Sequence, residues 1–394
     1  MKKRLGHYVV GGQLFTDKTP AVLHASATNN DIEWVFNDDV FDKIDWTVEP
    51  ELSLDQFYKM RAQQIRDEFD YVIIMASGGG DSTNVAWSFL DNGIHVDEII
   101  AAAPFSGLNN WDHQNSDNTA DNTISETIYA QLPLIRDIHQ KYPNVKITLH
   151  DYFKNMVEYE TDEWLYRSGD WIHPTSVARY DLEGFKHIVD LAESGKKVAI
   201  VYGIDKPNIV RGIDNEIKLV LSDLAVNVQR PAFSKEYPNV ENILFYWSPD
   251  MPLMLVKQAH VLARWIFMPE NSATRRWMYD ASNPPRSYEL NRIRQSTYER
   301  AIIPCIYPTT ARPVFQGHKP TRLFLGEHDG WFYKLHANTR TYEMIDSDFR
   351  NFYKTINQKF LNAPRTGYVI YFKEFKIGTM SQFMPPMEFQ SGSV

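Results

Sequence analysis

The chain has 394 residues, of which 43% are hydrophobic and 23% are charged, so it is long enough for two or three domains and apolar enough to bury a core. Its net charge of -9 argues, as an average, against a dedicated binder of nucleic acid or of anionic membranes. No apolar run reaches the roughly 20 residues of a membrane helix, and no signal-peptide pattern follows the basic start, so we expect a cytoplasmic protein. The single cysteine, Cys305, excludes an internal disulfide, a four-cysteine zinc site and a redox pair.

Residues 1–65 are predicted to form a small β-rich N-terminal module. Short β-prone segments occur at 8–10, 21–24 and 32–36, and Gly11-Gly12 is a turn signal. After Ser53, apolar residues recur at helical spacing, which predicts a helix with Ser53 as its N-cap.

Residues 66–255 are predicted to form an α/β domain because strand and helix patterns alternate along them. The predicted strands lie at 71–76, 98–103, 145–149 and 197–203, with a further candidate at 217–221, and the predicted helices lie at 82–91, 124–141 and 182–193. The strands are nearly continuous apolar runs, as burial on both faces of a parallel sheet requires. We therefore expect a doubly wound, mostly parallel sheet, followed by a separate helical and irregular C-terminal region at 256–394.

The most informative segment is a glycine-rich loop between the first of these strands and its helix. It consists of Ser77, Gly78, Gly79, Gly80, Asp81, Ser82 and Thr83. Consecutive glycines let backbone N–H groups approach a bulky anion, and the N-terminus of a helix favours negative charge. The three hydroxyls add donors and the aspartate can hold Mg²⁺ against phosphates, so we predict a pyrophosphate cradle. The alternative is a turn that only caps the helix. The Walker motif, the dinucleotide fingerprint and the serine-hydrolase elbow do not match this loop.

Residues 77–82 resemble the SGGxDS signature of the PP-loop ATP pyrophosphatases, the N-type superfamily with an adenine nucleotide alpha hydrolase-like fold. All six positions match, and the resemblance covers roughly residues 66–225. The sequence also looks like uncharacterised proteins of bacteriophages that are similar to phosphoadenosine phosphosulfate (PAPS) reductase, for which the compartment would be the host cytoplasm. The resemblance implies that ATP and Mg²⁺ bind here, that a substrate oxygen attacks the α-phosphorus, and that pyrophosphate leaves. A nucleophile then displaces AMP.

A second candidate group follows the predicted strand at 197–203. Ligands bind at strand ends in open α/β sheets, so Asp205 is predicted, with Asp81, to contact the metal, and Lys206 or Arg211 to neutralise phosphate charge. Gly203 is expected to leave room for a ligand. Together with Asp81, Lys206 and Arg211 are the predicted catalytic residues. The alternative is an ordinary turn with solvated side chains.

The single cysteine limits which reactions of this superfamily the chain is expected to catalyse. Cys305 lies in the apolar segment 301–307 and is predicted to be buried and inert. PAPS reductases use a C-terminal cysteine nucleophile, and thiolases of this superfamily use paired cysteines. We therefore expect an AMP-forming ligase or transferase in which an amine or ammonia completes the reaction. Two alternatives remain: a sulfonucleotide reductase-like enzyme that relies on the thiol of a partner, and a non-catalytic module that binds adenine nucleotide.

The net charge is distributed unevenly. Residues 1–256 contain 22 basic and 39 acidic residues, a net of -17, whereas residues 257–376 contain 19 and 10, a net of +9. Between 264 and 300, seven arginines are interleaved with tryptophan and tyrosine, a composition that can hold phosphates and stack bases. The expected partner is a small-molecule substrate, or nucleic acid through residues 257–376. The alternative for these cations is docking on the acidic N-terminal part. The family resemblance also implies a homodimer.

Overall fold

A computed structural model gives the fold of nine stretches of the chain. It describes residues 5–16, 18–103, 105–106, 126–151, 185–212, 214–223, 237–272, 302–307 and 371–384.

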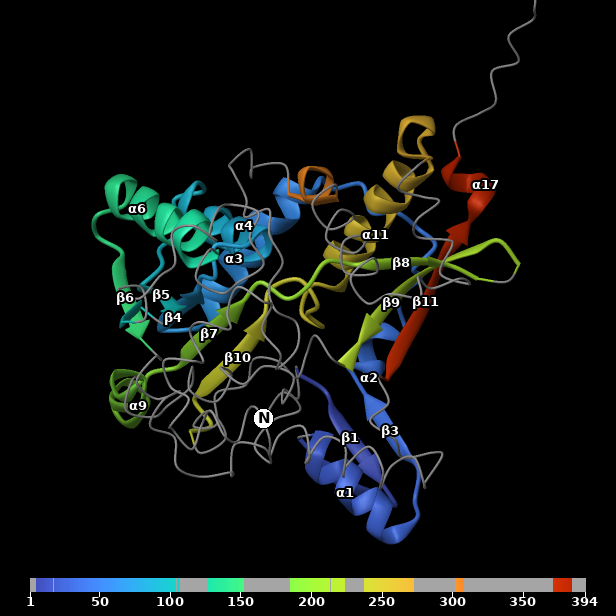
Figure 1. Cartoon of the computed structure of the whole chain (residues 1–394), viewed down its shortest axis with the longest axis horizontal. Coiled ribbons are helices and arrows are strands. Elements are labelled where there is room, and N and C mark those ends of the chain that lie inside the picture. Colours follow the sequence, from blue (N-terminus) through green and yellow to red (C-terminus); the bar gives the residue numbers. More distant parts are fainter. Residues whose placement is uncertain are drawn as a thin grey trace, which may run out of the picture.

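A five-stranded, all-parallel sheet lies in the left half of the view in Figure 1. Its strands, in the order of the sheet, are β10 (Val240–Leu244), β7 (Val198–Tyr202), β4 (Tyr71–Met75), β5 (Glu98–Ala103) and β6 (Lys146–Asp151). The chain adds β5 and β6 on one side of β4, and later adds β7 and β10 on the other side. The order therefore reverses between β4 and β7, and in open parallel sheets such a point is where ligands bind, at the carboxyl ends of the strands.

Helices pack on both faces of this sheet. They are α3 (Leu54–Glu68), α4 (Gly80–Leu90), the π-helix η3 (Thr127–Gln131), α6 (Leu132–Lys141) and α9 (Lys186–Glu193). Val72 and Ile74 belong to the core that includes α3, α4 and α6, whereas Ile73 packs with α9 in a second core. Because neighbouring strand residues point to opposite faces, both faces are buried, which explains the continuous apolar runs. The predicted N-cap is confirmed, since Ser53 and Gln56 form a capping box.

The N-terminal residues form a three-stranded antiparallel sheet in the order β2-β1-β3. Its elements are β1 (His7–Val10), β2 (Gln13–Phe15) and β3 (Ile32–Val35), accompanied by α1 (Lys18–Thr28) and α2 (Asp38–Phe41). The turn between β1 and β2 contains Gly11 and Gly12, with φ of 55° and 85°. The expected strand at 21–24 is wrong, because these residues lie in α1. Ala21 and Ala25, one helical turn apart, are both fully buried, and so short an apolar run does not separate strand from helix.

A third sheet is antiparallel, in the order β11-β9-β8, and combines β8 (Asn208–Arg211), β9 (Glu216–Ser222) and β11 (Phe372–Thr379). Residues 217–221 do form a strand, but it belongs to this sheet and not to the parallel one. The expectation of a helical and irregular C-terminal region is likewise only partly met, because β11 is a strand. Its pairing with β9 is non-local, so no sequence pattern predicts it, and it crosses the expected boundary at residue 256.

The other described C-terminal elements are α11 (Pro252–Phe267), the 3₁₀-helix η6 (Pro269–Asn271) and α17 (Met380–Phe383). α11 has 16 residues and packs against α3, α17 and β11. Within the described stretches, no helix combines the length and the apolar composition that crossing a membrane requires.

Candidate functional site

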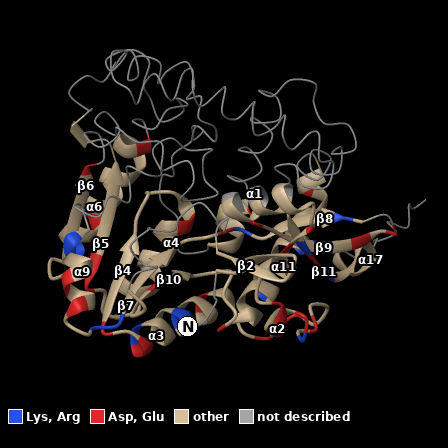
Figure 2. Ribbon diagram, turned by 90° about the horizontal axis from the view of Figure 1, so that it is seen from below, with Lys and Arg blue, Asp and Glu red and all other residues tan. Residues whose placement is uncertain are grey.

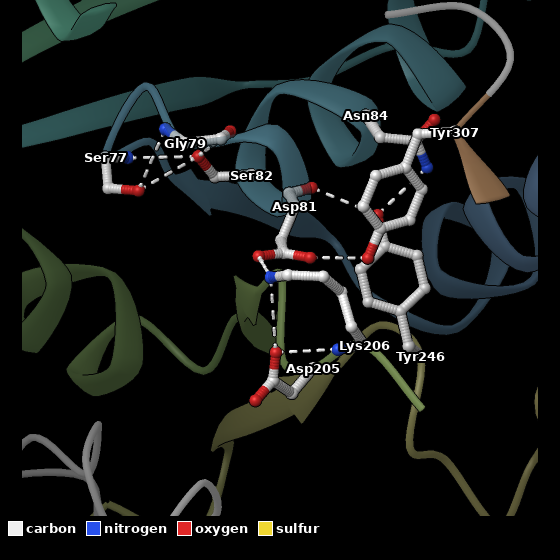
Figure 3. A network of polar contacts seen from close by, with 9 residues as sticks. All are labelled: Ser77, Gly79, Asp81, Ser82, Asn84, Asp205, Lys206, Tyr246 and Tyr307. Atoms are coloured by element: carbon white, nitrogen blue, oxygen red, sulfur yellow. Dashed lines mark hydrogen bonds and ion pairs between the residues drawn. The ribbon is translucent and has the colours of Figure 1, made fainter. Parts of the chain in front are cut away.

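The glycine-rich loop joins β4 to α4 and is folded by its own serines (Figure 3). Gly79 is the N-cap of α4, so the N–H groups of Gly80, Asp81 and Ser82 lie in the first helical turn, where a helix supplies no acceptor. Ser82 Oγ accepts from Ser77 N at 3.2 Å and donates to the carbonyl of Gly79 at 3.2 Å. Ser77 Oγ accepts from Gly79 N at 3.3 Å. The two serines therefore shape the loop, and its backbone donors gather at the N-terminus of α4.

The hydroxyls expected to bind phosphate differ in exposure. Ser77 is half-buried, whereas Ser82 and Thr83 are buried. The backbone N–H of Thr83 donates to the carbonyl of Gly79 at 3.0 Å and closes the first turn of α4. Ser77 is thus the most accessible of the three hydroxyls.

At two positions of the candidate site, another part of the backbone comes so close that only glycine fits. Gly78 has φ of 83°, and a Cβ there would lie 2.4 Å from the backbone nitrogen of Gln131. A Cβ on Gly203 would lie 2.7 Å from both Asp81 C and Ser82 N. This corrects the expectation that Gly203 leaves room for a ligand, because the first turn of α4 occupies that space.

Lys206 links the loop to the end of β7. Its ammonium group forms an ion pair with the Oδ2 atom of Asp81 and lies 3.5 Å from the Oδ1 atom of Asp205. The backbone N–H of Lys206 also donates to Asp205 Oδ1 at 2.6 Å. The exposed fractions of the side chains are 14% for Lys206, 21% for Asp81 and 43% for Asp205. Because β4 and β7 are neighbours, the two predicted groups meet, with one cation between two carboxylates.

The ionisation of Asp205 depends on its neighbours. Burial raises the pKa of Asp205, Lys206 opposes this rise, and the charge of Asp81 adds to it. A cation between the two groups offsets their mutual repulsion. Mg²⁺ in phosphate sites is commonly held by one or two carboxylates plus phosphate oxygens, so Asp81 and Asp205 fit such an ion. Among the described residues, no three His, Cys, Asp or Glu side chains gather into a metal site, so phosphate oxygens would have to complete the ligand set.

Two tyrosines that the sequence did not mark as site residues contact Asp81. The hydroxyl of Tyr307 donates to Asp81 Oδ1 at 2.5 Å, and the hydroxyl of Tyr246 donates to the Asp81 carbonyl at 3.0 Å. Asn84 Nδ2 in turn donates to the Tyr246 hydroxyl at 2.9 Å. Burial, followed by nearby negative charge and neighbouring tyrosines, raises the pKa of both hydroxyls well above the ordinary value, so both remain protonated donors.

Arg211, the other cation predicted at the phosphate, lies in the antiparallel sheet. Arg211 ends β8, is exposed, and donates to the side chain of Asn215 within the β8–β9 turn. The physical reason is that the chain leaves the parallel sheet after Lys206 and enters the antiparallel one. Of the cations expected at the phosphate, Lys206 is the one brought to the loop.

Cys305 has the environment of an unreactive thiol. The sequence predicted a buried thiol, and in the structure the thiol is partly buried, with its Sγ 3.9 Å from the carbonyl of Val261. Burial raises the pKa of the thiol to about 11, although Arg264 opposes the rise. The thiolate is the nucleophilic form, so Cys305 is a poor nucleophile at neutral pH.

The basic residues of 257–376 are paired wherever the structure describes them. The described ones are Lys257, Arg264, Lys373 and Lys376. Lys257 and Arg264 both pair with Glu49, at 2.7 Å and 2.9 Å. Lys373 pairs with Asp38 at 2.6 Å, and Lys376 with Glu216 at 2.8 Å. Figure 2 shows α11, β11 and α2 at the same end of the molecule. For these four cations the docking interpretation holds, and the arginines at 275–300 lie outside the described residues.

Comparison with known proteins finds no protein-family model that matches the chain and no curated protein that matches its sequence.

Proposed function

We propose that this chain is an ATP pyrophosphatase of the PP-loop type. It binds ATP on the loop, cleaves it to AMP and pyrophosphate while adenylylating a substrate oxygen, and acts as an AMP-forming ligase or transferase when an amine or ammonia displaces AMP. The observation that carries this proposal is the ion pair between Asp81, which follows β4, and Lys206, which follows β7, beside a loop whose backbone donors gather at one helix N-terminus.

The fold supports the same class of protein. The strand order β10-β7-β4-β5-β6, with α4 and α6 on one face and α9 on the other, is typical of a doubly wound sheet. An adenine nucleotide alpha hydrolase-like fold is of this kind. The proposed nucleotide site lies at the reversal of the strand order.

The proposed roles follow from charge and geometry. The N–H groups of the first turn of α4, aided by the helix dipole, bind the pyrophosphate part of ATP. Lys206 supplies a positive charge to the phosphates. Asp81 and Asp205 hold Mg²⁺, and this ion, when bound, neutralises the charge that develops on the leaving pyrophosphate. Positioning and charge neutralisation therefore account for most of the catalysis.

The reaction balances without an oxidant or reductant. A lone pair on a carboxylate, amide or ring oxygen attacks the α-phosphorus, and the bond from that phosphorus to the bridging oxygen breaks. The bonding pair leaves with pyrophosphate. An amine then attacks the activated carbon, loses a proton, and AMP departs.

The two alternatives are separated by ligand preference. A reductase-like enzyme would prefer PAPS to ATP, and the high pKa of Cys305 favours neither an internal thiol nucleophile nor a redox role for it. A non-catalytic module would bind ATP and release no pyrophosphate. Thermal unfolding with each nucleotide distinguishes the first case, since a ligand at 100 times its Kd adds about 2.7 kcal/mol to the stability.

The test of the proposal is pyrophosphate release from ATP and Mg²⁺ in the presence of ammonium and candidate acceptors such as carboxylates, amides and nucleosides. We expect turnover in the wild type and a loss of about 100-fold or more in Asp81→Asn, because the loop then lacks its carboxylate charge. Unchanged turnover in Asp81→Asn contradicts the mechanism.

A further inference from the structure

The segment 302–307 packs directly against the first turn of α4, although it lies more than 200 residues further along the chain. A Cβ on Gly80 would lie 3.0 Å from Ile303 Cδ1, so the side chain of Ile303 packs on the backbone of Gly80. The carbonyl of Ile306 accepts from the Tyr58 hydroxyl of α3 at 2.5 Å. Ile306 and Tyr307 are fully buried. This segment is therefore a fixed wall of the candidate site.

From this wall, Tyr307 and Lys206 engage the two oxygens of one carboxylate. Tyr307 donates to Asp81 Oδ1, and Lys206 pairs with Asp81 Oδ2. Figure 3 shows the two groups approaching the carboxylate from different elements. Rotation of the carboxylate would strain both contacts, so together they orient it.

The ring of Tyr307 is itself held in place. It stacks on Tyr246 with ring centroids 5.3 Å apart and an interplanar angle of 30°, and it lies 6.3 Å from the ring of Tyr58. Tyr246 bonds to the backbone carbonyl of Asp81 and not to its carboxylate. The two stacked tyrosines thus contact different parts of one residue.

We propose that Tyr307 is a positioning residue of the nucleotide site, whose hydroxyl holds Asp81 Oδ1 so that Oδ2 faces the cations of the site, which are Lys206 and the Mg²⁺ that accompanies ATP. This inference rests on the proposed function and adds to it a residue outside both predicted site segments. It predicts that Tyr307 affects the contribution of the metal to ATP binding and leaves the contribution of the loop backbone intact.

The experiment is calorimetric titration of the full-length protein with ATP in Mg²⁺ and with ATP in EDTA. The affinity ratio between the two buffers is the gain due to Mg²⁺. We expect Tyr307→Phe to reduce this gain about tenfold, as for a lost hydrogen bond to a charged group, and to leave the affinity in EDTA within about twofold of the wild type. Tyr71→Phe is the control, because its hydroxyl bonds to Glu98 at the other end of the sheet, and it should leave the gain unchanged.

Three results overturn the inference. An unchanged gain in Tyr307→Phe shows that the hydroxyl does not position Asp81, and an equal loss in both buffers shows a purely structural role. Absence of ATP binding by the wild type in either buffer contradicts the proposed function, and the inference with it. If Tyr307→Phe does not fold, Asp81→Glu replaces it. Its carboxylate is displaced from Tyr307 by one methylene, so we expect the same reduced gain, and an intact gain overturns the inference.

Discussion

Asp81 and Lys206 lie 125 residues apart in the sequence, yet their side chains form an ion pair at the carboxyl ends of two adjacent parallel strands. The pair places a fixed positive charge beside the donors of the α4 N-terminus. Since Asp205 lies on the other side of the same ammonium group, Lys206 occupies the position between two carboxylates where a divalent ion would be attracted.

Replacing Lys206 separates its two effects. In Lys206→Met the two carboxylates lose their shared cation, so we expect Mn²⁺ alone, in the absence of nucleotide, to bind more tightly than to the wild type. ATP should bind more weakly because a phosphate charge partner is gone. Electron paramagnetic resonance of free Mn²⁺ and calorimetry with ATP measure the two effects. Lys218→Met, which breaks an ion pair with Glu374, is the control. Unchanged Mn²⁺ binding in Lys206→Met contradicts this account.

A methyl group at Gly203 should destabilise the protein. Its Cβ would meet backbone atoms of Asp81 and Ser82 at 2.7 Å, and backbone cannot move aside as a flexible side chain can. We expect Gly203→Ala to lower the free energy of unfolding by about 1–3 kcal/mol, measured by urea denaturation. Gly212→Ala is the matched control, because its nearest neighbour is Lys218 Cε at 3.4 Å, and it should change stability by less than about 0.5 kcal/mol. Equal effects of the two substitutions would count against the close approach.

A buried carboxylate lies at the opposite end of the sheet, where β5 begins. Glu98 is fully buried, and it accepts from the Tyr71 hydroxyl at 3.1 Å and from Thr148. His187 Nε2 lies 3.0 Å from it and Lys146 Nζ 3.2 Å from it. These partners connect β4, β5 and β6 to α9.

The stability of the protein should depend on the ionisation of Glu98. Burial alone would raise its pKa, but hydrogen bonds from His187 and Thr148, with the charges of His187 and Lys146, lower it to about 2. A lowered folded-state pKa gives stability that is present above the unfolded-state value near 4.5 and is lost as the pH falls toward 2. The free energy of unfolding of the wild type should exceed that of Glu98→Gln by up to about 3 kcal/mol at pH 6, and the difference should shrink below pH 4. Urea denaturation across this range measures the difference, with the exposed Glu51→Gln as control. A difference independent of pH contradicts the prediction.

The thiol should be dispensable. Since the pKa of Cys305 is raised to about 11, we expect slow reaction with a thiol reagent at pH 8 in the folded protein and fast reaction after denaturation. Cys305→Ala should keep ATP-dependent pyrophosphate release. Loss of turnover in a folded Cys305→Ala protein would support thiol chemistry instead of the proposed reaction.

Local patterns predicted the parts of the site that are close in sequence. β4, the loop and α4 follow one another without a gap, and the capping box at Ser53 needs only Gln56, three residues away. The apolar runs predicted strands that are buried on both faces of a parallel sheet. In such a sheet the carboxyl ends of the strands share one edge, which places Lys206 near the loop. In each case the determining residues lie within one element, or a general rule of sheet topology connects them.

Contacts between segments that are far apart in the chain could not be predicted from the sequence. Tyr307 is 226 residues from Asp81, and within its apolar segment it has the composition of ordinary core. Tyr246 lies two residues after the end of β10, a strand that the sequence analysis does not predict. Arg211 was expected at the phosphate because it is close to Lys206 along the chain, but the chain changes sheets between them. The pairing of β9 with β11 joins segments that are far apart in the sequence, and neither strand contains a signal for its partner, so the sequence does not predict it.

The central claim is that the bond between the α- and β-phosphates of ATP is broken at this loop. Phosphorus NMR of ATP and Mg²⁺, incubated with the full-length protein, ammonium and the small-molecule filtrate of a cell extract, tests it most directly because it identifies both products. We predict AMP and pyrophosphate in equal amounts with the wild type and neither above background with Asp81→Asn. ADP and inorganic phosphate as products, or the same amount of AMP from both proteins, would contradict the claim.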